Sequence, residues 1–195
     1  MISCLLCGVG GQGTVLASRV IAQTALREGL FARTAETIGM AQRGGCVVSH
    51  VRFGHSVHSP LIPPGGADLI LGFEPGEAVR CLPFLKKGGL VVASTKPVWP
   101  ASGARYDAES VLRYLSAAAR LIEVDADAIT QASGSGKTLN IAMVGAAAGA
   151  GELGLSIDNI IETLTERLPE RSLAMNLAAL RAGTKLTRTH QHAQN

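Results

Sequence analysis

The sequence predicts an α/β fold: a Rossmann-like, doubly wound and mostly parallel sheet with an inserted β-hairpin and a C-terminal helical segment. Three observations lead to this prediction. A short apolar run, Ile2–Cys7, is followed by a glycine turn, Gly8–Gly13, and then by apolar residues at helical spacing. Short β-branched runs afterwards alternate with helical patterns, which is typical of βαβ units. The last part of the chain holds three helical patterns with no strand between them.

The first third of the chain predicts an opening βαβ unit and an insertion. A helix is expected from Val15 to near Gly29, and Leu30–Thr34 is expected to be the second strand. An ordinary dinucleotide-binding fold would then enter another helix. Here Cys46–Phe53 is β-branched and aromatic instead, so it predicts a β-hairpin or β-excursion that runs to a turn at residues 63–66.

A second βαβ unit follows the insertion, and the chain then ends in helices. The remaining expected strands are 67–72, 90–94 and 120–124, and the remaining expected helices are 75–85, 108–119, 125–131, 139–150, 157–168 and 172–186. Ser156 and Asp158 are well placed to cap the helix that starts at residue 157. We expect one domain, residues 1–186, followed by a loose polar tail, residues 187–195.

Composition excludes some classes of partner. Charged residues make up 17% of the 195 residues, so part of the surface can belong to a protein partner. The net charge is only +3, and Lys and Arg are scattered, which argues against a nucleic-acid partner. The longest apolar candidate for a membrane helix, Ile141–Ala150, is far shorter than the roughly 18 residues required. The N-terminus lacks the basic region of a signal peptide, so we expect a cytoplasmic protein with no membrane partner.

The four cysteines are interpreted as buried core thiols. Cys4 and Cys7 form a C-x-x-C, but residues three apart on a strand point to opposite faces, so these two thiols should not meet. Cys46 and Cys81 are isolated in the sequence. We therefore expect no metal site and no set of iron–sulfur ligands in this chain.

The glycine turn leaves three interpretations open. Gly8, Gly10 and Gly13 satisfy G-x-G-x-x-G between a strand and a helix, where backbone N–H groups can face an anion. The turn can be free of ligand, hold a phosphate-bearing ligand such as coenzyme A or a flavin nucleotide, or hold NAD. Glu36 lies about 20 residues further on, where NAD enzymes place the acid that holds a ribose. The β-excursion after Glu36, however, occupies the stretch that normally builds the adenine side of an NAD pocket. The candidate cofactor-binding residues in this part of the chain are Gly8, Gly10, Gly11, Gln12, Gly13 and Glu36.

A second glycine-rich segment, Gly134–Thr138, ends like a phosphate-binding P-loop. A P-loop requires a glycine six residues before the lysine, but that position holds Gln131, and no strong strand precedes the segment. ATP binding is therefore rejected. The segment is interpreted as the first turn of a helix, with Lys137 and Asn140 facing a neighbour.

Residues 36–45 carry long and polar side chains among three glycines, and loops of this kind present residues to ligands or partners. Together with the glycine turn and with Val47–Arg52, this segment resembles the gamma-type subunits of 2-oxoacid:ferredoxin oxidoreductases, particularly the beta subunit of the indolepyruvate type. The resemblance covers nearly the whole chain and includes Ala67–Ile70, Glu74 and Asn140. Ile38 departs from it, because a more polar residue is expected there.

The resemblance implies an accessory subunit of a thiamine-dependent complex. That complex would convert a 2-oxo acid, such as indolepyruvate or another aryl pyruvate, with coenzyme A and oxidised ferredoxin into an acyl-CoA, carbon dioxide and reduced ferredoxin. Thiamine diphosphate and the iron–sulfur clusters would belong to a large partner subunit, through which ferredoxin is reached. This chain alone would bind no cofactor firmly and would be inactive, with no catalytic residue of its own. The alternative is an independent Rossmann-like protein that binds NAD, a flavin nucleotide or coenzyme A.

The polar loop and the glycine turn are expected to line a shared interface. Arg43 can hold a carboxylate or a phosphate through its planar fork of donors, or form an ion pair that docks the partner. Glu36 can orient Arg43, hold a ribose or cap a turn. Gln42, Arg43 and Gly44 complete the set of candidate cofactor-binding residues, and His50 is interpreted as a strand side chain.

Overall fold

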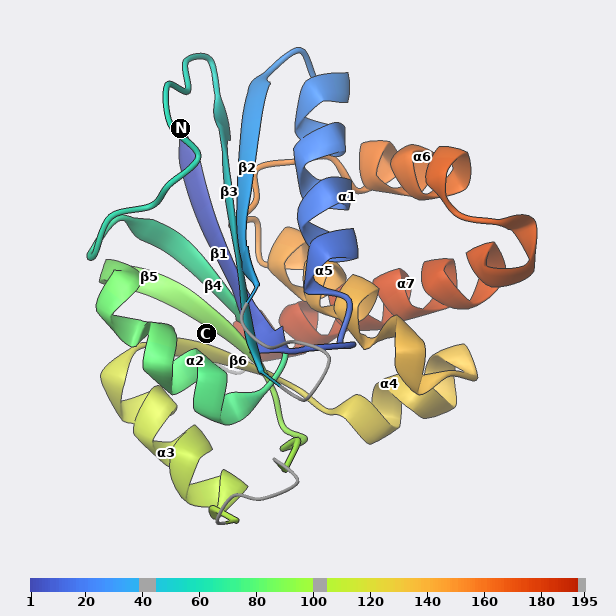
Figure 1. The fold of residues 1–195 in the computed structure, drawn as a ribbon. Coiled ribbons are helices and arrows are strands. Elements are labelled where there is room, and N and C mark those ends of the chain that lie inside the picture. The colour runs from blue at the N-terminus through green and yellow to red at the C-terminus, as the bar shows by residue number, and fades with distance from the viewer. Residues whose placement is uncertain (39–44, 100–104, 193–195) are drawn as a thin grey trace.

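The structure is a six-stranded sheet with helices on both of its faces (Figure 1). This computed structural model describes the chain except residues 39–44, 100–104 and 193–195, and it leaves the side chains of residues 38 and 187–192 undescribed. The strands are β1 (Ile2–Val9), β2 (Phe31–Ile38), β3 (Cys46–Gly54), β4 (Ala67–Gly72), β5 (Leu85–Ser94) and β6 (Arg120–Val124). The helices are α1 (Thr14–Arg27), α2 (Pro75–Cys81), α3 (Ala108–Ala118), α4 (Ala126–Ser133), α5 (Leu139–Gly149), α6 (Ile157–Arg167) and α7 (Glu170–His192).

The sheet has the order β2-β3-β1-β4-β5-β6. β1, β4, β5 and β6 run parallel, β3 is antiparallel to β1, and β2 is antiparallel to β3. The mostly parallel α/β sheet expected from the sequence is therefore confirmed. The opening unit differs in one respect: β2 runs in the direction of β1 but is separated from it by β3.

The inserted hairpin consists of β2 and β3 themselves, and a connecting segment, residues 55–66, follows it. Two arginines of the hairpin hold that segment through its carbonyl groups. Arg33 donates from Nε to the Val57 carbonyl at 2.8 Å, and Arg52 donates from Nη1 to the Ser59 carbonyl at 3.1 Å. The arginines therefore satisfy backbone groups that a loop lying on a sheet would otherwise leave unpaired.

Several boundaries differ from the sequence prediction for local reasons. β2 continues to Ile38 rather than ending at Thr34, so Glu36 lies within the strand. α2 ends at Cys81 rather than at Leu85, because Pro83 lacks the N–H that a continuing helix needs, and the chain makes a 3-10 turn before β5. α7 continues to His192, so the expectation of a loose tail from residue 187 is wrong for the backbone of residues 187–192.

The expected cap of α6 is confirmed in position but not in bonding. Ser156 is the N-cap residue and Asp158 lies in the first turn, yet the Ser156 side chain makes no capping hydrogen bond. Instead the Ser156 N–H donates to Oε1 of Glu28 at 2.7 Å, and the side-chain amide of Asn159 donates to the same oxygen. The C-terminal end of α1 and the start of α6 are thereby joined.

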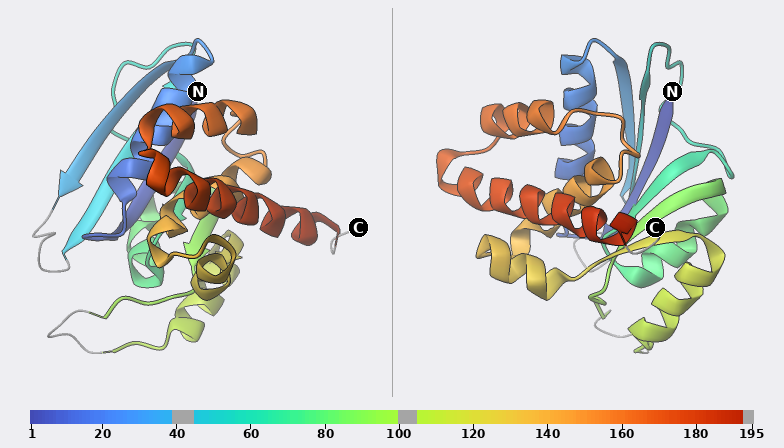
Figure 2. Two further views of the ribbon diagram at one scale, coloured as in Figure 1. Left: turned by 90° about the vertical axis from the view of Figure 1, so that its right-hand side faces the viewer. Right: turned by 180° about the vertical axis from the view of Figure 1, so that it is seen from behind.

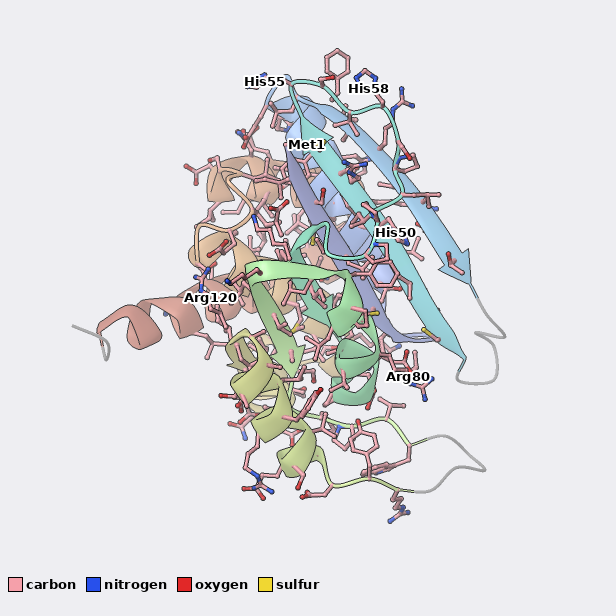
Figure 3. The ribbon with its side chains drawn as sticks, turned by 90° about the vertical axis from the view of Figure 1, so that its left-hand side faces the viewer. Met1, His50, His55, His58, Arg80 and Arg120 are labelled. Atoms are coloured by element: carbon pink, nitrogen blue, oxygen red, sulfur yellow. The ribbon has the colours of Figure 1, made fainter. Side chains whose placement is uncertain are left out.

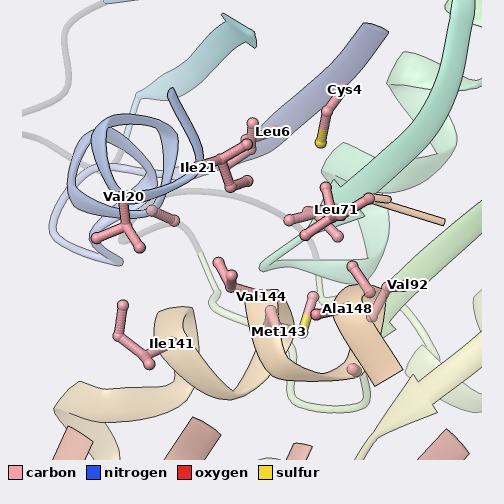
Figure 4. Close-up of a cluster of buried hydrophobic side chains, with 14 of the residues drawn as sticks. Cys4, Leu6, Val20, Ile21, Leu71, Val92, Ile141, Met143, Val144 and Ala148 are labelled. Atoms are coloured by element: carbon pink, nitrogen blue, oxygen red, sulfur yellow. The ribbon is translucent and has the colours of Figure 1, made fainter. Parts of the chain in front are cut away.

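Two hydrophobic clusters lie on opposite faces of the sheet. The larger one joins the sheet to α1 and α5 and includes Cys4, Leu6, Ile21, Leu71 and Met143 (Figure 4). The smaller one joins the other face to α2 and α3. α1 and α2 therefore leave the sheet toward opposite sides, as a doubly wound sheet requires.

An outer layer of helices covers the larger cluster. α6 packs against α1, and α7 packs across α5 (Figure 2). α5 is buried around its whole circumference. α5 and α7 approach each other so closely that glycines lie at their crossing. None of the helices in the described part of the chain is long and apolar enough to span a membrane.

The cysteines are free thiols, and their arrangement confirms one expectation and corrects another. Cys4 lies in the larger cluster and Cys7 in the smaller one, so they point to opposite faces as expected. Cys81, which is isolated in the sequence, joins Cys7 in the smaller cluster, because α2 packs on the face to which Cys7 points. Cys46, also isolated in the sequence, is half-buried at the start of β3 and is not the fully buried core thiol that was expected.

His50 is a buried side chain of β3, as the sequence indicated (Figure 3). Its Nδ1 accepts a hydrogen bond from the Ile62 N–H at 3.2 Å, and its ring meets that of Phe84 edge to face at 6.1 Å. Burial lowers the pKa of His50 below its ordinary value. The ring is therefore neutral in the folded protein at neutral pH, and it acts as an acceptor.

The lowered pKa of His50 makes stability depend on pH in one direction. The stability contributed by the neutral ring is present above the unfolded-state pKa of about 6.5 and is lost as the pH falls through the lower folded-state pKa. We expect the free energy of unfolding to fall between pH 8 and pH 5.5, and to fall less in His50→Asn, which keeps an acceptor near Nδ1 but cannot be protonated. Urea titrations at both pH values measure this, and equal losses in the two proteins would contradict it.

Candidate functional site

Three parallel strands end at one edge of the sheet, beside the glycine turn. β1 continues into Gly10–Gly13, β4 continues into Phe73 and Glu74, and β5 continues into Lys96. Because α1 and α2 leave toward opposite faces, the crevice between the ends of β1 and β4 is a topological switch point, where α/β sheets bind their ligands.

The glycine turn uses left-handed backbone at two positions. Gly11 has a φ of 91°, and Gly13, the N-cap residue of α1, has a φ of 80°. A Cβ added at Gly13 would also lie 2.3 Å from Nδ2 of Asn140. The turn is closed by the Gly10 N–H, which donates to the Gly45 carbonyl at 3.1 Å just before β3. Glycine is therefore required at Gly13 both for conformation and for space.

Gln12 ties the turn to the neighbouring strand end. Its Oε1 accepts from the Val9 N–H at 2.8 Å, and its Nε2 donates to the Phe73 carbonyl at 2.9 Å. A Cβ at Gly8 would lie 2.5 Å from Oε1 of Gln12, so the side chain occupies the space that Gly8 leaves open. Gln12 thus bridges the ends of β1 and β4 across the switch point.

Removing the Gln12 amide should destabilise the protein. Gln12→Ala leaves the Val9 N–H and the Phe73 carbonyl without their partner in a half-buried place, so we expect a loss of about 2 kcal/mol of unfolding free energy. Gln131→Ala, an exposed glutamine at the end of α4, is the matched control and should change stability by less than about 0.5 kcal/mol. Urea unfolding measures both, and equal stabilities of the two variants would contradict the bridging role.

Asn140 joins the turn to a helix from the far end of the sequence. It is buried in the first turn of α5, and its Nδ2 donates to the Gly13 carbonyl at 3.3 Å. Its Oδ1 accepts from the Ile141 N–H at 2.9 Å. The starts of α1 and α5 are therefore held side by side.

A pocket of about 520 Å³ opens between these two helix starts, and we call it the glycine-turn pocket. Its lining residues are Gly11, Gln12, Gly13, Leu16, Lys96, Val98, Ala126, Thr130, Gly136, Lys137, Leu139 and Asn140. The first turns of α1 and α5 contain no acidic residue. The positive ends of two helix dipoles therefore lie beside the pocket, and neither helix start carries an acid of its own.

Two lysines add formal charge to the pocket. Lys96 forms an ion pair with Asp127 at 2.7 Å, so part of its charge is already balanced. Lys137 is exposed and forms no ion pair within the described part of the chain. With the two helix starts, Lys137 makes the pocket suited to phosphate or carboxylate groups.

The buried carboxylate of Glu74 stabilises the other side of the switch point. Glu74 caps α2 by accepting from the Glu77 N–H at 2.9 Å, and it accepts a short hydrogen bond from the Tyr106 hydroxyl. Burial, and then the contact with Glu74, raises the pKa of Tyr106, so its hydroxyl stays protonated as a donor. Tyr106 in turn packs against Trp99, with ring centroids 5.0 Å apart. The chain beyond β5 is thus anchored to the start of α2.

The structure brings some of the predicted site residues together and separates another. Gly11, Gln12 and Gly13 line the pocket, while Gly8 and Gly10 shape the turn behind it. Glu36 is opposite Ser49 in the β2–β3 pair, with β3 between it and β1, and it does not line the pocket. Gln42, Arg43 and Gly44 lie outside the described residues.

Lys96 and Val98 were not singled out by the sequence interpretation, and Lys137 and Asn140 were expected only to face a neighbour. The structure shows what that neighbour is: the glycine turn of the same chain. The signal was present in Gly134–Thr138, a glycine-rich segment with a lysine directly before an apolar helix. Its spacing does not fit a P-loop. Because the segment lies at a helix start, however, its lysine can still face an anionic ligand.

Comparisons with known proteins identify similar chains over nearly the full length. The sequence profile of the pyruvate ferredoxin/flavodoxin oxidoreductase family matches residues 3–186. The chain is 39% identical over 188 residues to the indolepyruvate oxidoreductase subunit IorB of Archaeoglobus fulgidus, with 93% of each chain covered. It is 34% identical to the same subunit of Thermococcus kodakarensis, again with 93% of each chain covered.

Solved structures share the fold. The gamma subunit of the keto/oxoacid ferredoxin oxidoreductase from Geobacter sulfurreducens superposes with a TM-score of 0.74 at 19% identity, covering 97% of this chain and 99% of that one. The 2-oxoglutarate:ferredoxin oxidoreductase of Magnetococcus marinus, solved with 2-oxoglutarate, coenzyme A and succinyl-CoA bound, has a TM-score of 0.74 at 20% identity. That superposition covers 96% of this chain and 31% of the other.

Proposed function

The chain belongs to the pyruvate ferredoxin/flavodoxin oxidoreductase family as a small, IorB-like subunit, and from this premise we propose that it serves the oxidative decarboxylation of an aryl 2-oxo acid. The observation that carries the proposal is the 39% identity, over 93% of both chains, with a subunit named for indolepyruvate. In the proposed reaction the 2-oxo acid, coenzyme A and oxidised ferredoxin give an acyl-CoA, carbon dioxide and reduced ferredoxin.

The glycine-turn pocket is the part of this chain suited to coenzyme A. The cosubstrate carries a pyrophosphate and a 3′-phosphate, and the pocket presents helix starts without acids beside Lys96 and Lys137. The relative of known structure with coenzyme A bound supports this assignment, because nearly all of the present chain superposes on part of it. The chain would bind and orient the cosubstrate, and no residue of it is assigned a catalytic role.

Thiamine diphosphate and the iron–sulfur clusters are assigned to the partner subunit. Thiamine diphosphate would supply the stabilised carbanion of decarboxylation, and the clusters would carry electrons to ferredoxin. Within the described residues, no three His, Cys, Asp or Glu side chains are grouped so that they could hold a metal ion. The described residues therefore do not fit a cluster. In this proposal the part of the chain in the complex is to present the glycine-turn pocket and the turn.

The alternative of an independent NAD enzyme is disfavoured by one observation. Glu36, the candidate ribose ligand, lies two strands away from β1 and outside the glycine-turn pocket. An acid that holds a ribose must follow the strand next to the glycine turn. A calorimetric titration of the chain with NADH that shows tight binding would restore this alternative.

The proposed function is tested by purifying a tagged form of the chain from its native cells. The expected result is a large coloured partner that contains thiamine and iron–sulfur clusters. The purified complex should reduce a viologen dye with indolepyruvate only when coenzyme A is present, and more slowly with pyruvate or 2-oxoglutarate. A chain that purifies alone, or a complex that needs no coenzyme A, would overturn the proposal.

A further inference from the structure

The segment that follows β5 forms one side of the glycine-turn pocket, and we call residues 95–99 the pocket wall. Lys96 and Val98 of this wall both line the pocket. The wall is fixed at its start, because the Thr95 N–H donates to the Val124 carbonyl of β6 at 3.0 Å. Lys96 therefore lies directly beside a point where the backbone is tied to the sheet.

The other end of the pocket wall is held through one aromatic contact. Within the described part of the chain, neither Val98 nor Trp99 forms a hydrogen bond. Val98 is 40% exposed and Trp99 is 36% exposed, so burial alone does not fix either side chain. The Trp99 ring meets the Tyr106 ring edge to face, with centroids 5.0 Å apart. The position of this end of the wall therefore depends on Tyr106.

Tyr106 is itself held by the start of α2. Its hydroxyl donates to Oε1 of Glu74 and accepts from the Gly76 N–H at 3.2 Å. Glu74 is buried, and its other oxygen, Oε2, accepts from the Glu77 N–H at 2.9 Å. The carboxylate therefore cannot turn away from the hydroxyl without losing the cap of α2. Contacts thus run without a break from α2 through Tyr106 to Trp99 and the pocket wall.

The glycine-turn pocket has an apolar side as well as a charged one. Leu16, Val98 and Leu139 line it together with the lysines. Leu16 and Leu139 pack against the larger hydrophobic cluster, whereas Val98 lies outside both clusters. Besides its phosphates, coenzyme A carries an adenine ring and a pantetheine arm, which gain from contact with apolar side chains. Of the three apolar side chains, Val98 is thus the one whose place is set by the pocket wall rather than by the core.

We propose that Tyr106 is a positioning residue of the glycine-turn pocket: through Trp99 it holds Val98 where an uncharged part of coenzyme A packs. The identity of the ligand rests on the proposed function. The phosphate-binding side does not depend on Tyr106, because Lys137 and the glycine turn belong to other elements and Lys96 is fixed at the end of β5. Loss of the Tyr106 hydroxyl should therefore weaken the binding of coenzyme A but not that of inorganic pyrophosphate.

The hold on the pocket wall is tested in the full chain with Tyr106→Phe, which keeps the ring that contacts Trp99 and removes only the hydroxyl. Trp99 is the single tryptophan of the sequence, so its fluorescence reports on the wall alone. Acrylamide should quench this fluorescence about twofold more strongly in Tyr106→Phe than in the wild type. Tyr114→Phe, at the other tyrosine of the chain, is the matched control, because Tyr114 is exposed on α3, and it should behave as the wild type does. Equal quenching in all three proteins would overturn the proposal.

The effect on the ligand is measured in the assembled complex. In Tyr106→Phe the KM for coenzyme A should rise about fivefold while kcat changes little, the size expected when one apolar contact is partly lost. The inhibition constant of inorganic pyrophosphate, measured in competition with coenzyme A, should stay as it is in the wild type.

The other outcomes separate this proposal from the proposed function. An unchanged KM, an equal weakening of coenzyme A and pyrophosphate, or pyrophosphate that does not compete in the wild type would overturn the positioning role of Tyr106 in ligand binding. A wild-type complex whose rate does not depend on coenzyme A would overturn the proposed function instead. In that case the quenching of Trp99 would still decide whether Tyr106 holds the pocket wall.

Discussion

Replacing Gly183 by alanine should destabilise the protein by about 3 kcal/mol, even though alanine is the better helix former. A Cβ at this position in α7 would lie 2.0 Å from the Ala142 carbonyl oxygen and 2.8 Å from its carbonyl carbon. Both atoms belong to the backbone of α5, so no side chain can turn away. The clash therefore outweighs the roughly 1 kcal/mol that alanine gains over glycine in a helix interior.

The packing around the crossing of α5 and α7 explains why neither helix can move away to relieve the clash. α5 is buried on all sides against the sheet, α1 and α7, so a displaced helix would open voids elsewhere. Gly145 of α5 is in the reciprocal position: its Cβ would lie 2.3 Å from the Leu180 carbonyl oxygen. Gly145→Ala should thus show a loss of similar size.

Urea unfolding followed by circular dichroism measures the effect. Gly136→Ala is the matched control, because a Cβ there would be 3.4 Å from the Thr130 hydroxyl and the backbone has no left-handed conformation, so we expect a change below about 1 kcal/mol. A Gly183→Ala protein with the midpoint and slope of the wild type would show that the helices can separate without cost.

This crossing is a part of the fold that the sequence did not reveal. Local patterns predicted α5 and α7 as helices, because apolar residues recur at helical spacing and glycine or proline marks their ends. Gly145 and Gly183 carried no local signal, since a glycine inside a helical pattern is compatible with many packings. Their role depends on which helix lies against which, and that is decided by tertiary contacts.

The sheet, too, was predictable from the sequence in part only. The strand pattern and the helices between strands were sufficient to predict a mostly parallel, doubly wound sheet with a hairpin, since most strands carry an apolar or β-branched run of their own. The place of β3 between β1 and β2 was not predictable from the strands alone. Pairing partners are set by register and by which edge is open, and that position is what removes Glu36 from the glycine turn.

The candidate site was half predictable for a related reason. The glycine turn is formed by residues that are neighbours in the sequence, and the spacing of Gly8, Gly10 and Gly13 predicts a tight strand–helix turn. Asn140 and Lys137 reach the turn from more than 120 residues away, across a contact that only the packing of α5 beside α1 creates. Residue spacing therefore predicts the glycine turn, which forms one side of the pocket. The residues on the other side, at the start of α5, reach the pocket only through the tertiary fold.

Lys137→Ala should weaken the interaction with coenzyme A about tenfold in the assembled complex, the largest functional effect expected of a single charge in the pocket. Lys137 has no ion-pair partner among the described residues, so its charge is fully available to a phosphate, and a charge-assisted hydrogen bond contributes about 1.5–3 kcal/mol. Lys96→Ala should cost less, because the Lys96 charge is shared with Asp127.

Steady-state kinetics of the complex distinguish binding from chemistry. If Lys137 holds a phosphate remote from the reacting sulfur, its loss removes ground-state and transition-state binding equally, so the KM for coenzyme A should rise while kcat stays unchanged. Lys137→Arg should keep most of the affinity, and the defect of Lys137→Ala should shrink as salt screens the remaining charges. Lys87→Ala, an exposed lysine outside the glycine-turn pocket, is the matched control and should leave the KM as it is. An unchanged KM in Lys137→Ala would mean that the phosphates lie elsewhere and that the pocket only shapes the interface with the partner.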